Sequence, residues 1–77
     1  IGKKGVVRDP AVHAQVLQSF IALANELQLT IRDLTYSPVK GPEGNIEFLA
    51  HLSMQPGEDH YPPVAELVEQ AHKALKG

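Results

Sequence analysis

The sequence predicts an α/β fold built from two amphipathic helices and one antiparallel pair of strands. Three observations lead to this prediction. Apolar residues recur at helical spacing near both ends of the chain. Two stretches rich in β-branched, aromatic and other apolar residues lie between them. Only a short, turn-like connection separates those stretches, and a short connection favours antiparallel pairing.

Length and composition set the limits of what this domain can be. The 77 residues suffice for one small domain, which would be marginally stable alone. There is no cysteine, and the formal charge of -2 exerts no general attraction on nucleic acid or anionic lipid. No apolar run approaches the roughly 18 residues of a membrane-spanning helix. A chain that begins with Ile1 instead of Met suggests a processed or truncated product.

The first helix is expected over residues 10–28, after a loop over residues 1–9. Asp9 is a good N-cap, and Pro10 suits the first helical position because its missing N–H costs nothing there. No glycine marks the end of the helix. The stripe predicted to face the core consists of Val12, Val16, Phe20, Leu23 and Leu27, widened by Leu17, Ile21 and Ala24.

Two strands are expected next, over residues 29–36 and 46–53. The first mixes polar and apolar residues on both faces, which suggests a partly wet edge strand that ends at Pro38. The residues KGPEGN between the strands have the composition of a turn. The second strand alternates more cleanly and is expected to pack hard on one side. That side carries Ile46, Phe48, Ala50 and Leu52, and the other carries Glu47, Leu49, His51 and Ser53.

The last helix is expected over residues 62–76. Two prolines open it, early acidic and late basic residues match the helix dipole, and apolar residues recur on one face. A lone two-stranded ribbon is only marginally stable in water. The chain is therefore expected to be one piece of a larger sheet.

Glu47 is the residue that most needs an explanation from the sequence. An ionised carboxylate near a core is costly unless it is paired, and the neighbouring residues offer no obvious partner. Glu47 either faces water, pairs with Arg32 across the hairpin, or meets a group from elsewhere in the molecule or from a ligand.

Two stretches, GKKGVVRDPAVHAQVL and SPVKGPEGNIEFLAHL, resemble the C-terminal part of the TlyA-type proteins. This family is known as haemolysin A or as FtsJ-like ribosomal RNA methyltransferases, and the resemblance covers roughly residues 2–53. It implies that residues 1–77 are the C-terminal helix–strand–strand–helix part of a Rossmann-like methyltransferase domain. It also implies that the parent protein uses S-adenosylmethionine to methylate a ribose 2′-hydroxyl of ribosomal RNA in the cytoplasm.

The resemblance assigns a catalytic role to one residue of this chain. FtsJ-like enzymes use a Lys-Asp-Lys-Glu tetrad, and Glu47 in GNIEFL matches the glutamate of the last strand. A carboxylate beside an ammonium would hold the catalytic lysine in place and bias its pKa. The other tetrad members would lie upstream of Ile1, and the glycine-rich cofactor loop is absent. The isolated chain is therefore expected to bind no cofactor and to be inactive.

The remaining candidates are weaker. Lys3, Lys4, Arg8 and Lys40 are candidate contacts to RNA phosphates, with ordinary solvated loop charge as the alternative. The four histidines lack a metal-ligand spacing and are expected to be unrelated, although His51 shares a strand face with Glu47.

Two other classes of function stay open from the sequence. One is a membrane-acting haemolysin or cytolysin, and the other is a stand-alone module that oligomerises. The last helix has too few basic residues for a membrane-surface helix, so stable membrane insertion is not expected. Self-association of the isolated chain is expected to use an exposed sheet edge.

Overall fold

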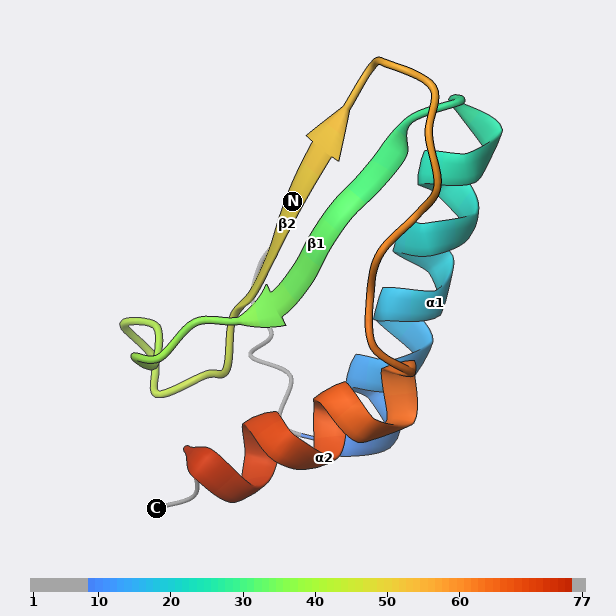
Figure 1. Ribbon diagram of the computed structural model, residues 1–77. Coiled ribbons are helices and arrows are strands. Elements are labelled where there is room, and N and C mark those ends of the chain that lie inside the picture. Colours follow the sequence, from blue (N-terminus) through green and yellow to red (C-terminus); the bar gives the residue numbers. More distant parts are fainter. Residues whose placement is uncertain (1–8, 76–77) are drawn as a thin grey trace.

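The computed structural model describes residues 9–75, which form a two-stranded sheet with two helices packed against one face (Figure 1). The elements are α1 (Pro10–Glu26), β1 (Thr30–Tyr36), β2 (Phe48–Ser53) and α2 (Val64–Ala74). The strands are antiparallel. The predicted helix–strand–strand–helix order and antiparallel pairing are therefore confirmed. The N-cap prediction also holds, since the Asp9 side chain accepts a hydrogen bond from the N–H of Ala11 at 2.9 Å.

The helix α1 ends at Glu26 and not at the predicted residue 28, because Gln28 adopts a left-handed backbone with φ 61°. The N–H of Gln28 donates to the carbonyl of Asn25, and the N–H of Leu29 donates to the carbonyl of Ala24. This pair of bonds is the Schellman arrangement, in which the left-handed position is usually glycine. A glutamine in that position explains why composition did not reveal the end of the helix.

A β-bulge in β1 decides which side chains form the core. The register shifts between Ile31 and Asp33, so that Arg32 has no partner on β2. The extra residue reverses the alternation of faces. Ile31 and Leu34, three residues apart, are therefore both buried, with only 1% and 2% of their surface exposed. The mixed faces predicted for this strand result from the bulge.

The segment after β2 covers the outer edge of β1 at this point. The N–H of Ile31 donates to the Asp59 carboxylate, and the carbonyl of Ile31 accepts from the N–H of His60, both at 2.8 Å. The hydroxyl of Thr30 donates to the carbonyl of Gln55. In Figure 1 this segment, drawn in orange, returns alongside β1 toward the start of α2. Ile31 is thus held by its side chain and by both of its backbone groups.

The strand β2 is shorter and less buried than predicted. It begins at Phe48 instead of residue 46, since the regular strand ladder ends with the bond from the N–H of Ser37 to the carbonyl of Glu47. Pro38 follows Ser37 and has no N–H to extend the ladder. No residue of β2 is fully buried, so the prediction of hard packing on one side is wrong. The helices pack mainly on β1, and β2 extends beyond them.

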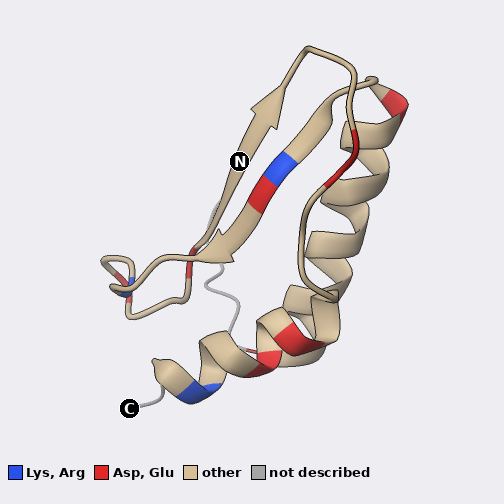
Figure 2. Ribbon diagram, viewed as in Figure 1, with Lys and Arg blue, Asp and Glu red and all other residues tan. Residues whose placement is uncertain are grey.

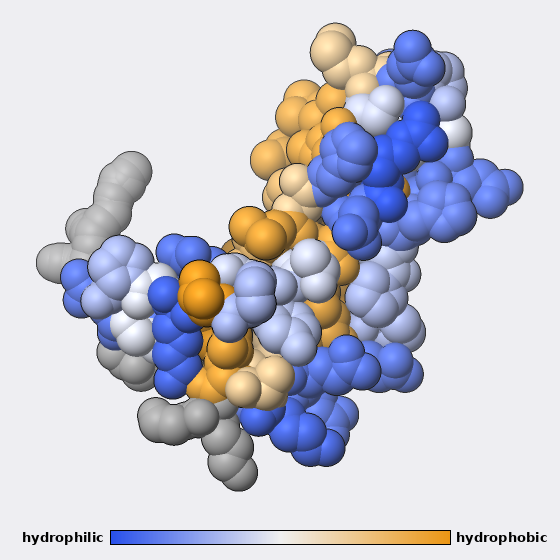
Figure 3. Space-filling view, turned by 60° about the vertical axis from the view of Figure 1, so that its left-hand side comes forward, coloured by the Kyte–Doolittle hydropathy of each residue, from blue (hydrophilic) through white to orange (hydrophobic). Residues whose placement is uncertain are grey.

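The buried face of α1 agrees with the predicted stripe only in part, at Leu17 and Ala24. His13, Leu17 and Ala24 are buried, whereas Val16, Leu23 and Leu27 are at least half exposed. Apolar residues occur around much of this helix, so their spacing alone did not determine which side packs. Figure 3 shows hydrophobic residues reaching the surface beside hydrophilic ones.

The helix α2 begins two residues later than predicted, at Val64. A residue that precedes a proline disfavours the helical region, which excludes Pro62, and Pro63 is the extended N-cap with ψ 135°. The predicted apolar face is otherwise confirmed. Val64, Leu67, Val68 and Ala71 are buried, and they join Leu17, Ala24, Ile31 and Leu34 in one core.

Replacing Gln28 with glycine should stabilise the fold by about 0.5–1 kcal/mol, because glycine adopts the left-handed conformation without a Cβ clash. Urea unfolding of the parent protein measures the change. The same substitution at the exposed helical residue Gln18 is the matched control and should destabilise by about 1 kcal/mol. A loss of stability at both positions would contradict the assignment of Gln28 as the helix end.

Candidate functional site

Glu47 lies immediately before β2, at the end of the loop that joins the two strands. Its backbone is held by the bond from the Ser37 N–H, and its side chain is exposed. Within residues 9–75 the Glu47 carboxylate forms no hydrogen bond or ion pair. The alternative pairing with Arg32 is not observed, since the Arg32 guanidinium lies over Gly57 in the segment after β2. A partner for this carboxylate is thus absent from the described part of the chain.

The loop around Glu47 is closed by its own backbone. The N–H of Gly41 donates to the carbonyl of Asn45 at 2.7 Å, and the N–H of Gly44 donates to the carbonyl of Gly41 at 2.9 Å. Gly44 has φ 78°, a left-handed conformation that other residues rarely adopt. The buried Ser37 side chain also accepts from the N–H of Val39. The loop therefore presents Glu47 from an ordered turn.

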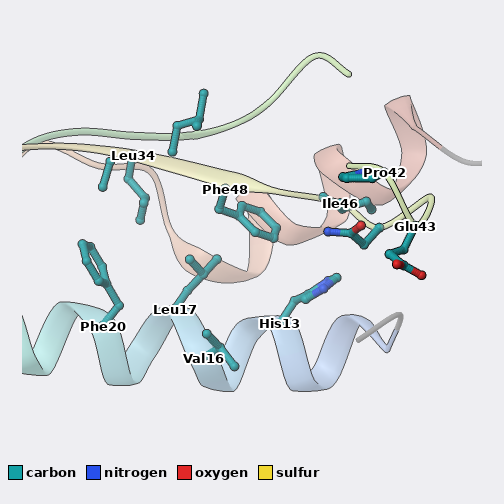
Figure 4. A pocket seen from close by; sticks show the side chains of 12 residues that line it. His13, Val16, Leu17, Phe20, Leu34, Pro42, Glu43, Ile46 and Phe48 are labelled. Carbon is teal, nitrogen blue, oxygen red and sulfur yellow. The ribbon is translucent and has the colours of Figure 1, made fainter. Parts of the chain in front are cut away.

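An open groove lies beside this loop, between α1 and the inner face of the sheet (Figure 4). It has a volume of about 620 Å³. Figure 4 shows Val16, Leu17 and Phe20 of α1 facing Leu34 and Phe48 across it, with Glu43 at the loop end. The lining is mostly apolar, so the groove suits a hydrophobic occupant better than a charged one.

Two histidines are connected across the helices, contrary to the expectation of four unrelated ones. Nδ1 of His13 in α1 and Nε2 of His72 in α2 are 2.8 Å apart. His13 is buried, and its ring meets Phe48 edge-on at 5.4 Å between centroids. One ring must donate and the other accept, so at least one of them is neutral. Fifty-nine residues separate the pair, and no local pattern could have revealed it.

The candidate RNA contacts can be placed only in part. Lys40 is exposed on the loop between β1 and β2, whereas Lys3, Lys4 and Arg8 lie outside the described residues. Figure 2 shows that this loop carries charges of both signs. In the described part of the chain, no three histidine or acidic side chains come together as a metal site would require. Across residues 9–75, neither helix has the length and apolar character needed to cross a membrane.

Known proteins are similar to this chain in sequence, and solved structures are similar to it in fold. The chain is 44% identical over 82 aligned positions to "Putative rRNA methyltransferase YqxC" of Bacillus subtilis, an alignment that covers 99% of the chain. It is 35% identical over 52 positions to "Hemolysin A" of Brachyspira hyodysenteriae, covering 68% of the chain. The chain belongs to the TlyA-type haemolysin A family. No protein-family model matches it.

Solved structures of haemolysin-named proteins have the same arrangement of elements. A hemolysin-named protein from Streptococcus thermophilus superposes with a TM-score of 0.79 at 38% identity, over 92% of this chain. One from Lactococcus lactis superposes with a TM-score of 0.71 at 31% identity, over 88% of this chain. The chain covers 26% and 34% of those two structures, and 29% and 22% of the two curated relatives. It thus spans about a third or less of each haemolysin-family protein that it matches.

Glu47→Gln should change the free energy of unfolding by less than about 0.5 kcal/mol, because the carboxylate is exposed and unpaired within the described residues.

His13→Ala should lower the free energy of unfolding by about 1–3 kcal/mol, since it removes a buried ring and its hydrogen bond to His72. Urea unfolding of the parent protein measures both, with His51→Ala on the exposed part of β2 as the control. A large loss from Glu47→Gln would show that Glu47 has a structural role.

Proposed function

We propose that this chain is the C-terminal part of a Rossmann-like, S-adenosylmethionine-dependent methyltransferase that acts on the 2′-hydroxyl of ribosomal RNA. The observation that carries the proposal is the 44% identity, along nearly the whole chain, to a protein named as an rRNA methyltransferase. The exposed carboxylate of Glu47 then has a role in the parent protein. The isolated chain supplies that carboxylate but not the rest of the site.

The bare edge of β2 supports a larger sheet in the parent protein. Because the carbonyl of Glu47 bonds to β1, the alternation of an antiparallel pair turns the backbone groups of Phe48, Ala50 and Leu52 away from β1. No backbone group within residues 9–75 pairs with this edge. The groove and the exposed residues Val16 and Leu49 flank it. We assign a further strand and its covering residues to this place, and self-association of the isolated chain to the same edge.

The described residues do not fit a binding site for S-adenosylmethionine. A nucleoside cofactor is commonly held where a glycine-rich turn leads from a strand into the first turn of a helix. Here α2 follows β2 only after a ten-residue span (residues 54–63) that includes three prolines. The groove is lined mainly by apolar side chains. We therefore place the cofactor, which supplies the methyl group when bound, on other parts of the parent protein.

Glu47 would act on a lysine from the remainder of the site. Glu47 stands immediately before β2, the strand beside which we assign the next strand, and its carboxylate lies over the loop near Gly41. An ammonium placed there would form a charge-assisted hydrogen bond with it, which fixes the direction of the lysine side chain. A lysine held in this way can orient the ribose hydroxyl and take part in its deprotonation. No group within residues 9–75 is bonded to the Glu47 carboxylate, so no group there competes with the lysine for it.

In the full-length protein, Glu47→Gln should lower the rate of methyl transfer to ribosomal subunits by about 100-fold or more, because the amide cannot anchor the lysine ammonium as a charged acceptor. The measurement is single-turnover transfer of a labelled methyl group. The affinity for RNA should change by less than twofold. A rate equal to that of the wild type would exclude a catalytic role for Glu47.

The names of the relatives favour membrane lysis as a second candidate function. Liposome leakage by the same purified full-length protein separates the two functions. Our proposal requires methyl transfer by the wild type and no leakage above that of a denatured sample. Leakage without methyl transfer would overturn the methyltransferase proposal.

We also propose that Lys3, Lys4, Arg8 and Lys40 contact RNA phosphates in the full-length protein. Replacing all four with alanine should weaken RNA binding and reduce the slope of log affinity against log salt by about 0.7 for each lost contact to a single strand. Filter binding at several salt concentrations measures both. The control is Lys73→Ala on the exposed surface of α2, which should change neither. Unchanged binding by the quadruple variant would refute these contacts.

A further inference from the structure

The end of the Glu47 side chain has a defined place in the loop. Its Oε2 atom lies 2.7 Å from the point where a Cβ on Gly41 would stand. Both polar atoms of the Asn45 amide lie near the same point, Oδ1 at 2.6 Å and Nδ2 at 2.8 Å. Real Cβ atoms essentially never have contacts this short. The carboxylate of Glu47 and the amide of Asn45 therefore share a space that exists only because residue 41 has no side chain.

The backbone around this space is fixed independently of the two side chains. The N–H of Gly41 bonds to the carbonyl of Asn45, and the carbonyl of Gly41 accepts from the N–H of Gly44. The carbonyl of Glu47 is bonded to the N–H of Ser37. Backbone hydrogen bonds therefore hold Gly41 on one side of the space and Glu47 on the other. The direction of the Glu47 carboxylate then depends on what it meets at residue 41.

We propose that Gly41 and Asn45 are positioning residues for the Glu47 carboxylate. Gly41 provides the space for the carboxylate, and the Asn45 amide borders that space, so that the carboxylate is held in one position over the loop. This inference rests on the function proposed above, because it names the residues that place the proposed catalytic group. It predicts that a methyl group added at residue 41 lowers the rate of catalysis by displacing the Glu47 carboxylate.

Alanine at residue 41 is a selective perturbation. Within residues 9–75 Gly44 has a positive φ and Gly41 does not. Alanine can therefore adopt the backbone conformation of Gly41. The added methyl group would displace the ends of two flexible side chains and leave the backbone in place. Gly57→Ala is the matched control. A Cβ there would stand 3.2 Å from Nη1 of Arg32, also the end of a flexible side chain but on a different loop.

The test uses single-turnover methyl transfer by the full-length protein. Gly41→Ala should lower the rate of the chemical step by about 10- to 100-fold, because a displacement of about 1 Å costs up to that much. The KM for RNA should change by less than twofold, and Gly57→Ala should leave both values unchanged. Within the Glu47→Gln background, Gly41→Ala should cause no further loss, since residues that act through one group are not additive. Asn45→Ala should also lower the rate, and it should cause no further loss in the Glu47→Gln background.

Each outcome bears on one of the two claims. An active wild type whose rate is unchanged by Gly41→Ala, or a full further loss in the Glu47→Gln background, would overturn the positioning role alone. A wild type that transfers no methyl group would overturn the proposed function. Crystal structures of the full-length variants judge the positioning directly in either case. The Glu47 carboxylate should move in Gly41→Ala and stay in place in Gly57→Ala, and an unmoved carboxylate in Gly41→Ala would refute the inference.

Discussion

The anchoring of Ile31 is the constraint on which the rest of this structure depends. Its side chain is buried in the core, and its two backbone groups bond to Asp59 and His60 in the segment after β2. The bulge at Arg32 lets Leu34 enter the same core. The helices and the returning segment therefore gather around β1, which leaves β2 as the outer strand. Glu47 is exposed because it precedes β2, whose outer edge no other element of residues 9–75 covers.

The exposed edge, groove and apolar residues of the described chain all favour the same interpretation. In the part of the chain that the structure describes, the edge of β2 without a backbone partner, the groove beside it and the exposed apolar residues of α1 all lie where further structure could pack. Relatives that match nearly the whole chain are about three or more times its length. Within the described residues, the edge of β2 has no backbone partner and the Glu47 carboxylate is unpaired, and both have a single explanation in our account. Both belong to surfaces that the remainder of a larger domain would complete.

Much of the fold was predictable from local signals. Asp9 and Pro10 marked the start of α1, and the short connection indicated antiparallel strands. The bulge at Arg32 was not predictable, because it is defined by the register in which β1 pairs with β2, and the local sequence does not give that register. The buried face of α1 was predicted only in part, since apolar residues occur around much of the helix: Leu17 and Ala24 are buried as predicted, but Val16 and Leu23 are exposed. For the site, Glu47 could be singled out as a carboxylate without a local partner. The approach of its carboxylate to the position of a Cβ on Gly41, and the pairing of His13 with His72, arise only from the folded arrangement.

The most direct test of this account is the crystal structure of the full-length protein with S-adenosylmethionine bound. The quantity to measure is the distance from the Glu47 carboxylate to the nearest lysine ammonium. Our account predicts a distance of about 3 Å, within hydrogen-bond reach, with a strand from the remainder of the protein paired to the free edge of β2. A Glu47 carboxylate that faces bulk solvent, far from any lysine and from the cofactor, would contradict it.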